Sequence, residues 1–138
     1  MAEGASAGGA ATGRILLVED DHDYASFLVH VLRKTAGHAV TPVDDAAHAV
    51  RLLSSPGWDI LITDIHLPDG NGLDIVRRAR ELTPSTRTVV MTAFASVDSA
   101  VDALRNKVDE FLTKPVRPSD LLGTVNRLLL AAREAAKR

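Results

Sequence analysis

Short aliphatic runs alternate with longer amphipathic segments from Arg14 onward. Ile15 to Val18 is a continuous aliphatic run, which is typical of a strand that is buried on both faces. Comparable runs follow at 38–43, 59–63, 88–92 and 109–113. Strands that alternate with helices in this way predict an α/β domain whose parallel sheet carries helices on both faces.

The segments between these runs have apolar residues at i, i+3 and i+4 spacing, which predicts helices with one buried face. The expected inner faces are Phe27, Leu28, Val31 and Leu32; Ala46, Ala49, Val50 and Leu53; Leu73, Val76 and Ala79; Val97, Ala100, Val101 and Leu104; and Leu121, Leu122, Val125, Leu128, Leu129 and Ala132. Gly37 and the Pro56-Gly57 turn are plausible ends for the first two helices. Ser96 is a suitable N-cap for the fourth.

Composition limits the class of protein. The chain has 138 residues, of which 46% are hydrophobic, so one domain with one core is expected. A net charge of −2 argues against direct nucleic-acid binding. There is no cysteine, and no apolar run reaches the length of a membrane span, so we expect a cytoplasmic protein. Residues 1–13 are expected to be a flexible tail before a domain at 14–136.

Polar residues follow four of the five predicted strands. Glu19-Asp20-Asp21 follows the first strand, and Asp64 the third. Thr92 ends the fourth, and Lys114-Pro115 follows the fifth. Right-handed crossovers bring the carboxyl ends of parallel strands to one edge of a sheet, where ligands bind in open α/β folds. These side chains are therefore expected to meet in one crevice.

Each of these residues also has an ordinary structural explanation. Asp21 and Asp23 suit a solvated loop or an N-cap, and most lysines lie at the surface. Glu19, Asp20 and Asp64, however, form a cluster of carboxylates that repel one another unless they are protonated or hold a cation. Carboxylates favour a hard dication such as Mg²⁺. Spacing alone leaves both a metal site and a solvated acidic loop open.

Four sequence segments resemble response-regulator receiver domains: ILLVEDD, DILITDIHLPDGNGLD, VVMTAFAS and DEFLTKPV. They occur in the order of that family, each at the end of a different predicted strand, and the resemblance spans about 14–136. It implies a flavodoxin-like receiver fold, in which a five-stranded parallel sheet has the order 2-1-3-4-5.

The resemblance also implies a phosphorylation site. Asp64 matches the phosphoacceptor and Asp20 a direct ligand of Mg²⁺, for which Mn²⁺ is an alternative. Glu19 would act mainly through metal-bound water. His66 matches the position whose backbone carbonyl binds the metal.

The remaining matched positions concern the switch. Thr92 and Lys114 match the hydroxyl and the ammonium that contact the phosphoryl group. Phe111 matches the aromatic residue whose rotation, together with a shift of Thr92, reports phosphorylation to the outer surface. The Lys114-Pro115 bond is typically cis in this family, and we expect it to be cis here.

The sequence departs from the family pattern before the fifth strand. Asn106-Lys107-Val108 replaces the usual glycine-alanine pair, and we expect Asn106 to take the left-handed conformation that glycine would supply. His66 and Phe94 match positions that flank the phosphoryl group. The other histidines, at 22, 30, 38 and 48, show no metal-ligand spacing and are expected to have no role.

The implied function is a phosphoacceptor switch rather than a conventional enzyme. A sensor histidine kinase or phosphotransfer protein would donate the phosphoryl group. A protein partner, an output domain or a second copy of the chain would read the changed surface. A haloacid-dehalogenase-type phosphatase is disfavoured, because such enzymes place a second aspartate where this chain has His66. A constitutive pseudo-receiver that only binds a partner is the main alternative.

Overall fold

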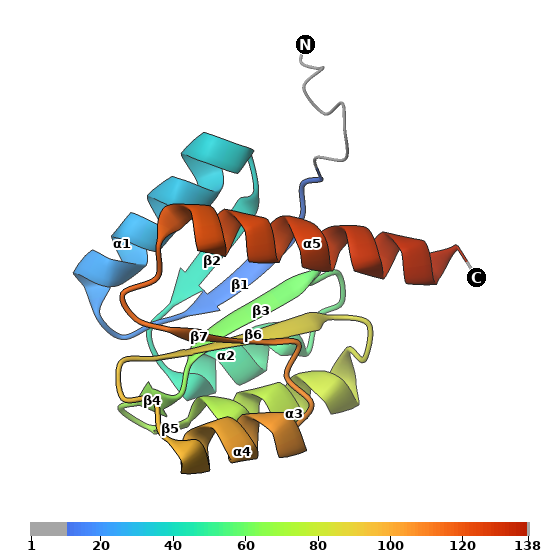
Figure 1. The fold of residues 1–138 in the computed structure, drawn as a ribbon. Coiled ribbons are helices and arrows are strands. Elements are labelled where there is room, and N and C mark those ends of the chain that lie inside the picture. Colours follow the sequence, from blue (N-terminus) through green and yellow to red (C-terminus); the bar gives the residue numbers. More distant parts are fainter. Residues whose placement is uncertain (1–10, 138) are drawn as a thin grey trace.

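Five parallel strands form the central sheet, in the order β2-β1-β3-β6-β7 (Figure 1). Their bounds are Arg14–Val18 for β1, Ala39–Val43 for β2, Ile60–Asp64 for β3, Arg87–Thr92 for β6 and Glu110–Thr113 for β7. The computed structural model describes residues 11–137. Most of the predicted tail, residues 1–10, lies outside that range. Counted along the chain, the five strands have the predicted order 2-1-3-4-5, which is confirmed.

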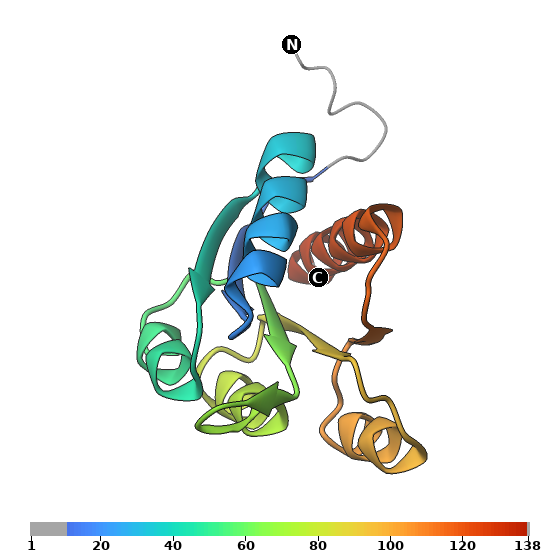
Figure 2. The ribbon, with the colours of Figure 1, turned by 90° about the vertical axis from the view of Figure 1, so that its left-hand side faces the viewer.

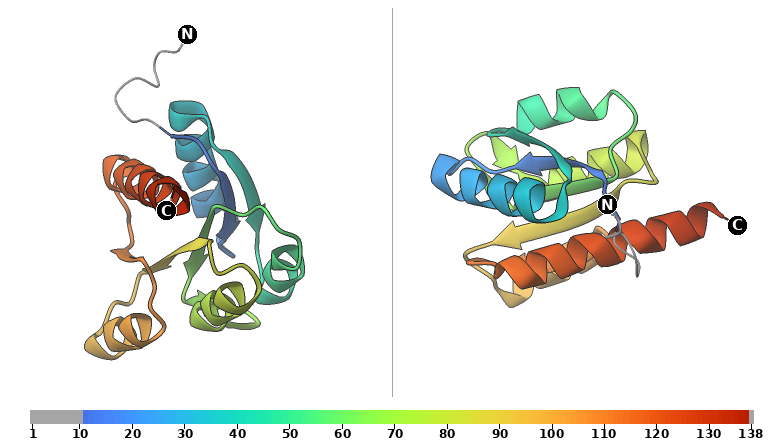
Figure 3. Two further views of the ribbon diagram at one scale, coloured as in Figure 1. Left: turned by 90° about the vertical axis from the view of Figure 1, so that its right-hand side faces the viewer. Right: turned by 90° about the horizontal axis from the view of Figure 1, so that it is seen from above.

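Helices cover both faces of the sheet (Figures 2 and 3). Their bounds are His22–His30 for α1, Ala46–Leu53 for α2, Gly72–Leu82 for α3, Val97–Arg105 for α4 and Pro118–Ala136 for α5. A π-helical turn, Val31–Thr35, continues α1. Helices α1 and α5 lie on one face, and α2, α3 and α4 on the other. Among the described residues, no helix is both long and apolar enough to cross a membrane.

The aliphatic run of β1 is buried on both faces, as its sequence predicts. Ile15 and Leu17 pack in the core under α1 and α5. Leu16 and Val18 pack in the core under α2 and α3. Full burial of each such side chain contributes about 1.5–3 kcal/mol. Strand β1 lies between β2 and β3, and its side chains contribute to the core on both faces of the sheet.

A small hairpin that the sequence did not predict follows β3. Its strands are β4, His66–Leu67, and β5, Gly70–Asn71. At its turn, the Asp69 carboxylate accepts hydrogen bonds from the N–H groups of Ala46 (2.7 Å) and Ala47 (3.1 Å) at the start of α2. These backbone bonds lower the pKa of Asp69. The hairpin is thus fastened to the helix N-terminus, where a carboxylate is favourable.

The predicted inner face of α1 is partly wrong. Ala25 and Leu28 are buried, but Phe27 is 41% exposed. Each residue turns a helix by about 100°, so Phe27 lies beside the buried row rather than within it. Its ring sits next to that of Tyr24, with 6.0 Å between their centroids.

The predicted inner face of α4 is wrong. Ser96 does cap this helix, as expected, through a capping box with Ser99. However, Val97 is 80% exposed and Leu104 is 78% exposed, whereas Ala103 is 1% exposed. The small Ala103 side chain faces the sheet, so the larger apolar residues point outward. One buried residue gives α4 a much smaller contact with the core than the other helices have.

The turn between α4 and β7 differs from the expectation by one residue. Asn106 has a φ of −88°, because it still closes the helix, with its N–H 3.0 Å from the carbonyl oxygen of Asp102. Lys107 takes the left-handed conformation instead, with a φ of 56°. The predicted cis bond between Lys114 and Pro115 is present.

Residues 11–13, which the sequence assigned to the tail, contact the body of the domain. Ala11 N–H donates to Asn126 Oδ1 at 3.1 Å, and Arg133 donates to the carbonyl oxygen of Thr12. Gly13 N–H donates to Nδ1 of His38 at 3.1 Å. His38 is buried and binds the N-terminal segment, whereas the expectation that it has no metal-binding or catalytic role stays a prediction.

We predict that replacing His38 with asparagine removes part of the acid sensitivity of folding. Burial, and then the charge of Arg133, lower the pKa of His38 below its usual 6.5. The contribution of His38 to the free energy of unfolding is therefore complete above pH 6.5. It is lost as pH falls through the lower pKa that His38 has in the folded state. Asparagine keeps an acceptor near the position of Nδ1 but does not titrate.

Urea unfolding of both proteins at pH 8 and pH 5, followed by the fluorescence of the buried Trp58, measures this difference. The wild type should lose about 1 kcal/mol more than the variant on acidification. Equal losses would show that the Gly13–His38 bond does not depend on the protonation of His38.

Candidate functional site

The predicted polar residues converge at the carboxyl ends of neighbouring strands. Asp64 ends β3 and Thr92 ends β6. Glu19 directly follows β1, and Lys114 directly follows β7. The strands β1, β3, β6 and β7 are consecutive in the sheet and parallel, so their carboxyl ends share one edge. The sheet topology therefore brings these residues to the one edge where the sequence predicted that they meet.

Three carboxylates form an acidic cluster at this edge. Each of Glu19, Asp20 and Asp64 offers an oxygen that lies within 4.8 Å of the others. Glu19 and Asp64 are buried and Asp20 is exposed. Hard dications prefer such oxygen ligands, so the cluster could hold a metal ion.

Lys114 lies between the two buried carboxylates. Its Nζ is 2.5 Å from Asp64 Oδ2 and 2.5 Å from Glu19 Oε1. The contact with Asp64 has hydrogen-bond geometry, whereas the contact with Glu19 Oε1 is an ion pair without that geometry. A carboxylate oxygen has two lone pairs, so Glu19 Oε1 can accept a hydrogen bond from a ligand or from metal-bound water beside its ion pair.

Burial and charge act in opposite directions on these groups. Burial raises the pKa of Glu19, and the contact with Lys114 and the hydrogen bond from Asp21 N–H only partly offset this effect. Burial alone would lower the pKa of Lys114, but its bonds to Asp64 and Glu19 raise it overall. Lys114 therefore stays cationic and balances the negative charge of the cluster.

The backbone around Asp64 fixes the direction of its carboxylate. His66 N–H donates to Asp64 Oδ1 at 3.1 Å, while the hydroxyl of Thr63 donates to the Asp64 carbonyl oxygen at 2.8 Å. The His66 imidazole is exposed and meets Phe94 edge-on, with 6.2 Å between the ring centroids. A metal-binding role for the His66 carbonyl stays a prediction.

Thr92 ends β6, and Phe111 lies on the neighbouring strand β7, where it pairs with Val90. Thr92 is fully buried, and its hydroxyl accepts a hydrogen bond of 3.1 Å from Phe94 N–H. Its carbonyl oxygen accepts from Lys114 N–H at 2.9 Å, which joins the ends of the two strands. Phe111 is partly buried against the core that includes Ala103 of α4.

Comparison with known proteins identifies the family. The sequence profile of the response regulator receiver domain matches residues 15–126. The chain belongs to the response regulator receiver family. The response regulator receiver protein CpdR of Brucella abortus (strain 2308) is 38% identical over 119 residues, which cover 86% of this chain and 98% of CpdR. This receiver covers no more than 26% of several longer regulators that it also matches.

Solved structures show the same fold. A CheY-like response regulator receiver domain protein from Methanospirillum hungatei JF-1 aligns with a TM-score of 0.85 at 26% identity, over 91% of this chain and 99% of that chain. A response regulator from Burkholderia pseudomallei, crystallised with a phosphorylated aspartic acid, calcium ion and citrate, aligns with a TM-score of 0.76 at 26% identity. That alignment covers 91% of this receiver and 75% of the other chain.

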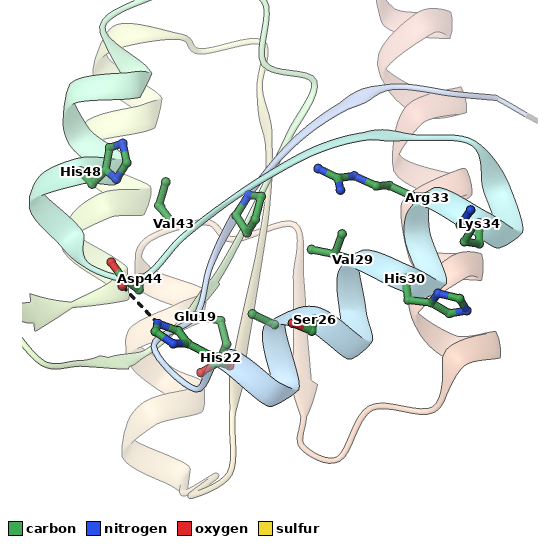
Figure 4. A pocket seen from close by; sticks show the side chains of 12 residues that line it. Glu19, His22, Ser26, Val29, His30, Arg33, Lys34, Val43, Asp44 and His48 are labelled. Carbon is green, nitrogen blue, oxygen red and sulfur yellow. Dashed lines mark hydrogen bonds and ion pairs between the residues drawn. The ribbon is translucent and has the colours of Figure 1, made fainter.

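A wide groove lies beside the charge cluster of this receiver (Figure 4). It has a volume of about 720 Å³ between α1 and the edge strand β2, and it reaches Glu19. His22 of α1 bonds Asp44 at its mouth, at 3.2 Å. Arg33 occupies the carbonyl oxygen of Val40 through a hydrogen bond of 2.6 Å, and Pro42 lacks a backbone donor. Both features disfavour the pairing of another strand with β2.

Sequence reasoning missed two residues that contact the site, Tyr24 and Gly72. Tyr24 gave no motif, because its contacts join α1 to a turn 92 positions away. Gly72 lies in the family-like segment DILITDIHLPDGNGLD, but its role depends on a tertiary contact. A Cβ on Gly72 would lie 2.0 Å from the Asp64 carbonyl oxygen, so only glycine lets α3 start directly against the end of β3.

We predict that replacing Gly72 with alanine damages the site as well as the fold. The clash involves backbone rather than a flexible side chain, so Asp64 or the start of α3 must move. The free energy of unfolding should fall by about 1–3 kcal/mol, the usual cost of overpacking. Calorimetric titration with Mg²⁺ should also show weaker binding.

Gly123 in α5 provides a matched control, because a Cβ there would meet nothing within 4 Å. Alanine at position 123 should stabilise the protein by about 0.5–1 kcal/mol and leave Mg²⁺ binding unchanged. If the two variants behaved alike, the close approach of Gly72 to Asp64 would not matter to the site.

Proposed function

We propose that this receiver is a phosphoacceptor switch of a two-component phosphorelay. Asp64 receives the phosphoryl group from a sensor histidine kinase or phosphotransfer protein in the cytoplasm, and residues 14–136 form the switch domain. The observation that carries the proposal is a buried aspartate that is paired with a lysine and has carboxylate oxygens of two further acidic residues within 4.8 Å. The phosphorylated aspartic acid named for the structurally similar Burkholderia pseudomallei regulator agrees with it.

We propose Mg²⁺ as the metal, with Mn²⁺ as an alternative. Asp20 and Asp64 would be direct ligands, Glu19 would act through water, and His66 would contribute its backbone carbonyl. The donor set is all oxygen, and the buried Glu19 carboxylate can accept a hydrogen bond from metal-bound water. When bound, the ion supplies positive charge next to the transferring phosphoryl oxygens.

The chemical step is a displacement at phosphorus. A carboxylate oxygen of Asp64 attacks, an O–P bond forms, and the bond from phosphorus to the donor's leaving group breaks. The ammonium of Lys114 passes from the Asp64 carboxylate to a phosphoryl oxygen and stabilises its negative charge. Water later attacks phosphorus, which releases phosphate and restores the carboxylate. The protein catalyses only these two steps on itself.

The proposed output is a change in the surface around α4. Thr92 would turn toward the phosphoryl group, and Phe111 would follow into the space between β7 and α4. Helix α4 can respond because Ala103 is its only buried residue. Its outer side, continued by the 76% exposed Phe94, offers a protein partner, an output domain or a second copy an apolar surface.

We predict that phosphorylation requires both Asp64 and Mg²⁺. The wild-type protein and the Asp64→Asn variant are incubated with acetyl phosphate, with and without Mg²⁺, and their intact masses are measured. The wild type should gain one phosphoryl group only when Mg²⁺ is present, and the variant should gain none. The Asp102→Asn variant is the control, because Asp102 is exposed on α4 and should leave the adduct unaffected.

If the wild type gained no adduct and also failed to bind beryllofluoride with Mg²⁺, the site would be inert. The protein would then be a constitutive pseudo-receiver that binds a partner without phosphorylation. An adduct that persisted in Asp64→Asn would instead place the acceptor at another residue.

We predict opposite effects of Lys114→Gln on metal binding and on phosphorylation. Without the ammonium, the cluster loses a positive charge that repels the metal ion, so Mg²⁺ should bind about tenfold more tightly. Transfer from acetyl phosphate at saturating Mg²⁺ should be about 100-fold slower, because one preorganised charge contact is lost. Calorimetry and rates of adduct formation measure the two effects. A loss of both would point to a damaged fold.

A further inference from the structure

Tyr24 connects helix α1 to the turn that carries Lys114. It lies in the first part of α1 and is partly buried against the core under α1 and α5. Its hydroxyl oxygen accepts a hydrogen bond of 3.0 Å from Val116 N–H. The Nζ of Lys114 lies over its ring, 4.9 Å from the centroid. One side chain thus contacts both the catalytic ammonium and the backbone two residues beyond it.

We propose that Tyr24 is a positioning residue for Lys114 in the phosphoryl-transfer reaction. This inference rests on the proposed function for its catalytic meaning, although the contact itself can be measured without it. The ring holds the ammonium on the side facing α1, and the hydroxyl fixes the turn from which Lys114 extends.

Contacts that restrict the position of the Lys114 ammonium matter because the four-carbon stem of lysine is flexible. Glu19 and Asp64 attract the ammonium from the strand ends, whereas the face of an aromatic ring attracts it from the other side. The Lys114 side chain is only 14% exposed, so water screens this attraction weakly. The three contacts confine Nζ to the space beside Asp64 where phosphoryl oxygens would develop charge.

The same turn of α1 also orients Glu19. Asp21 caps the helix by accepting a hydrogen bond of 3.1 Å from Tyr24 N–H through its carboxylate. The N–H of Asp21 donates to Glu19 Oε2 at 3.0 Å. The start of α1 therefore fixes the positions of Glu19 and, through Tyr24, of Lys114. The capping bond uses the Tyr24 backbone, so side-chain substitutions leave it in place.

Two variants separate the contacts of Tyr24. Tyr24→Phe keeps the ring and removes the acceptor for Val116 N–H, whereas Tyr24→Leu removes both. Phe27→Leu is the matched control: it removes a neighbouring, exposed ring of α1, whereas the cation–π contact with Lys114 and the hydrogen bond from Val116 N–H are both made by Tyr24. Urea unfolding confirms that each variant is folded under the conditions of the assays.

Nuclear magnetic resonance of the lysine side chains tests the contact directly. The chain has only four lysines, at 34, 107, 114 and 137, so their signals can be assigned. The terminal methylene protons of Lys114 should be shifted upfield by the Tyr24 ring in the wild type, Tyr24→Phe and Phe27→Leu. The shift should disappear in Tyr24→Leu. An unshifted Lys114 in the wild type would overturn the proposal.

Phosphorylation by acetyl phosphate tests the consequence. At saturating Mg²⁺, Tyr24→Leu should react roughly 3- to 10-fold more slowly than the wild type, with Tyr24→Phe between them. Phe27→Leu should react at the wild-type rate. The affinity for Mg²⁺ should not fall in any of the four proteins, because no hydrogen bond among the described residues joins the Tyr24 side chain to the three carboxylates, and an ammonium that is held less firmly beside them repels the metal less.

The possible failures can be told apart. Wild-type rates in Tyr24→Leu, or a loss of Mg²⁺ affinity that parallels its loss of rate, would overturn the positioning role and leave the proposed function intact. If the wild type itself accepted no phosphoryl group, the proposed function would fail, and the lysine signals alone would decide whether Tyr24 holds Lys114.

Discussion

The contact of Lys114 with Glu19 and Asp64 is the interaction on which the site depends. The parallel strands β1 and β3 bring two buried carboxylates to the same edge of the sheet, where their charges repel. An ammonium from the end of β7, 2.5 Å from each, compensates that repulsion. A buried charge without a partner is costly. The two ion pairs therefore fix the relative positions of the segments that follow β1, end β3 and follow β7.

The residues around this cluster are packed more tightly on some sides than on others. The Glu19 side is held by the capped start of α1, and the Asp64 side by Gly72 and the hairpin that is fastened to α2. The opposite side, formed by β7 and α4, has far less buried apolar surface. A change in charge at Asp64 can therefore be transmitted toward α4 at a lower energetic cost than in other directions.

The sequence predicted the five strands of the central sheet and the convergence of Glu19, Asp64 and Lys114 correctly, because those signals are local. Runs such as Ile15 to Val18 mark strands buried on both faces, and polar residues at strand ends mark the crevice. The same local reasoning failed for Phe27 and for α4. Apolar spacing shows that a helix has an apolar face, but it does not show whether that face meets the sheet or a surface left open for a partner.

The sequence by itself determined the α/β class, the strand order through the family resemblance, and the residues that converge at the sheet edge. Only the tertiary structure decided that Gly72 must lack a side chain, that Lys107 rather than Asn106 takes the left-handed turn, and that Tyr24 lies against Lys114. Such contacts join residues far apart in the chain or depend on the backbone geometry of one turn. The periodicity of apolar residues does not predict these contacts, because they depend on how the folded helices and strands pack against one another.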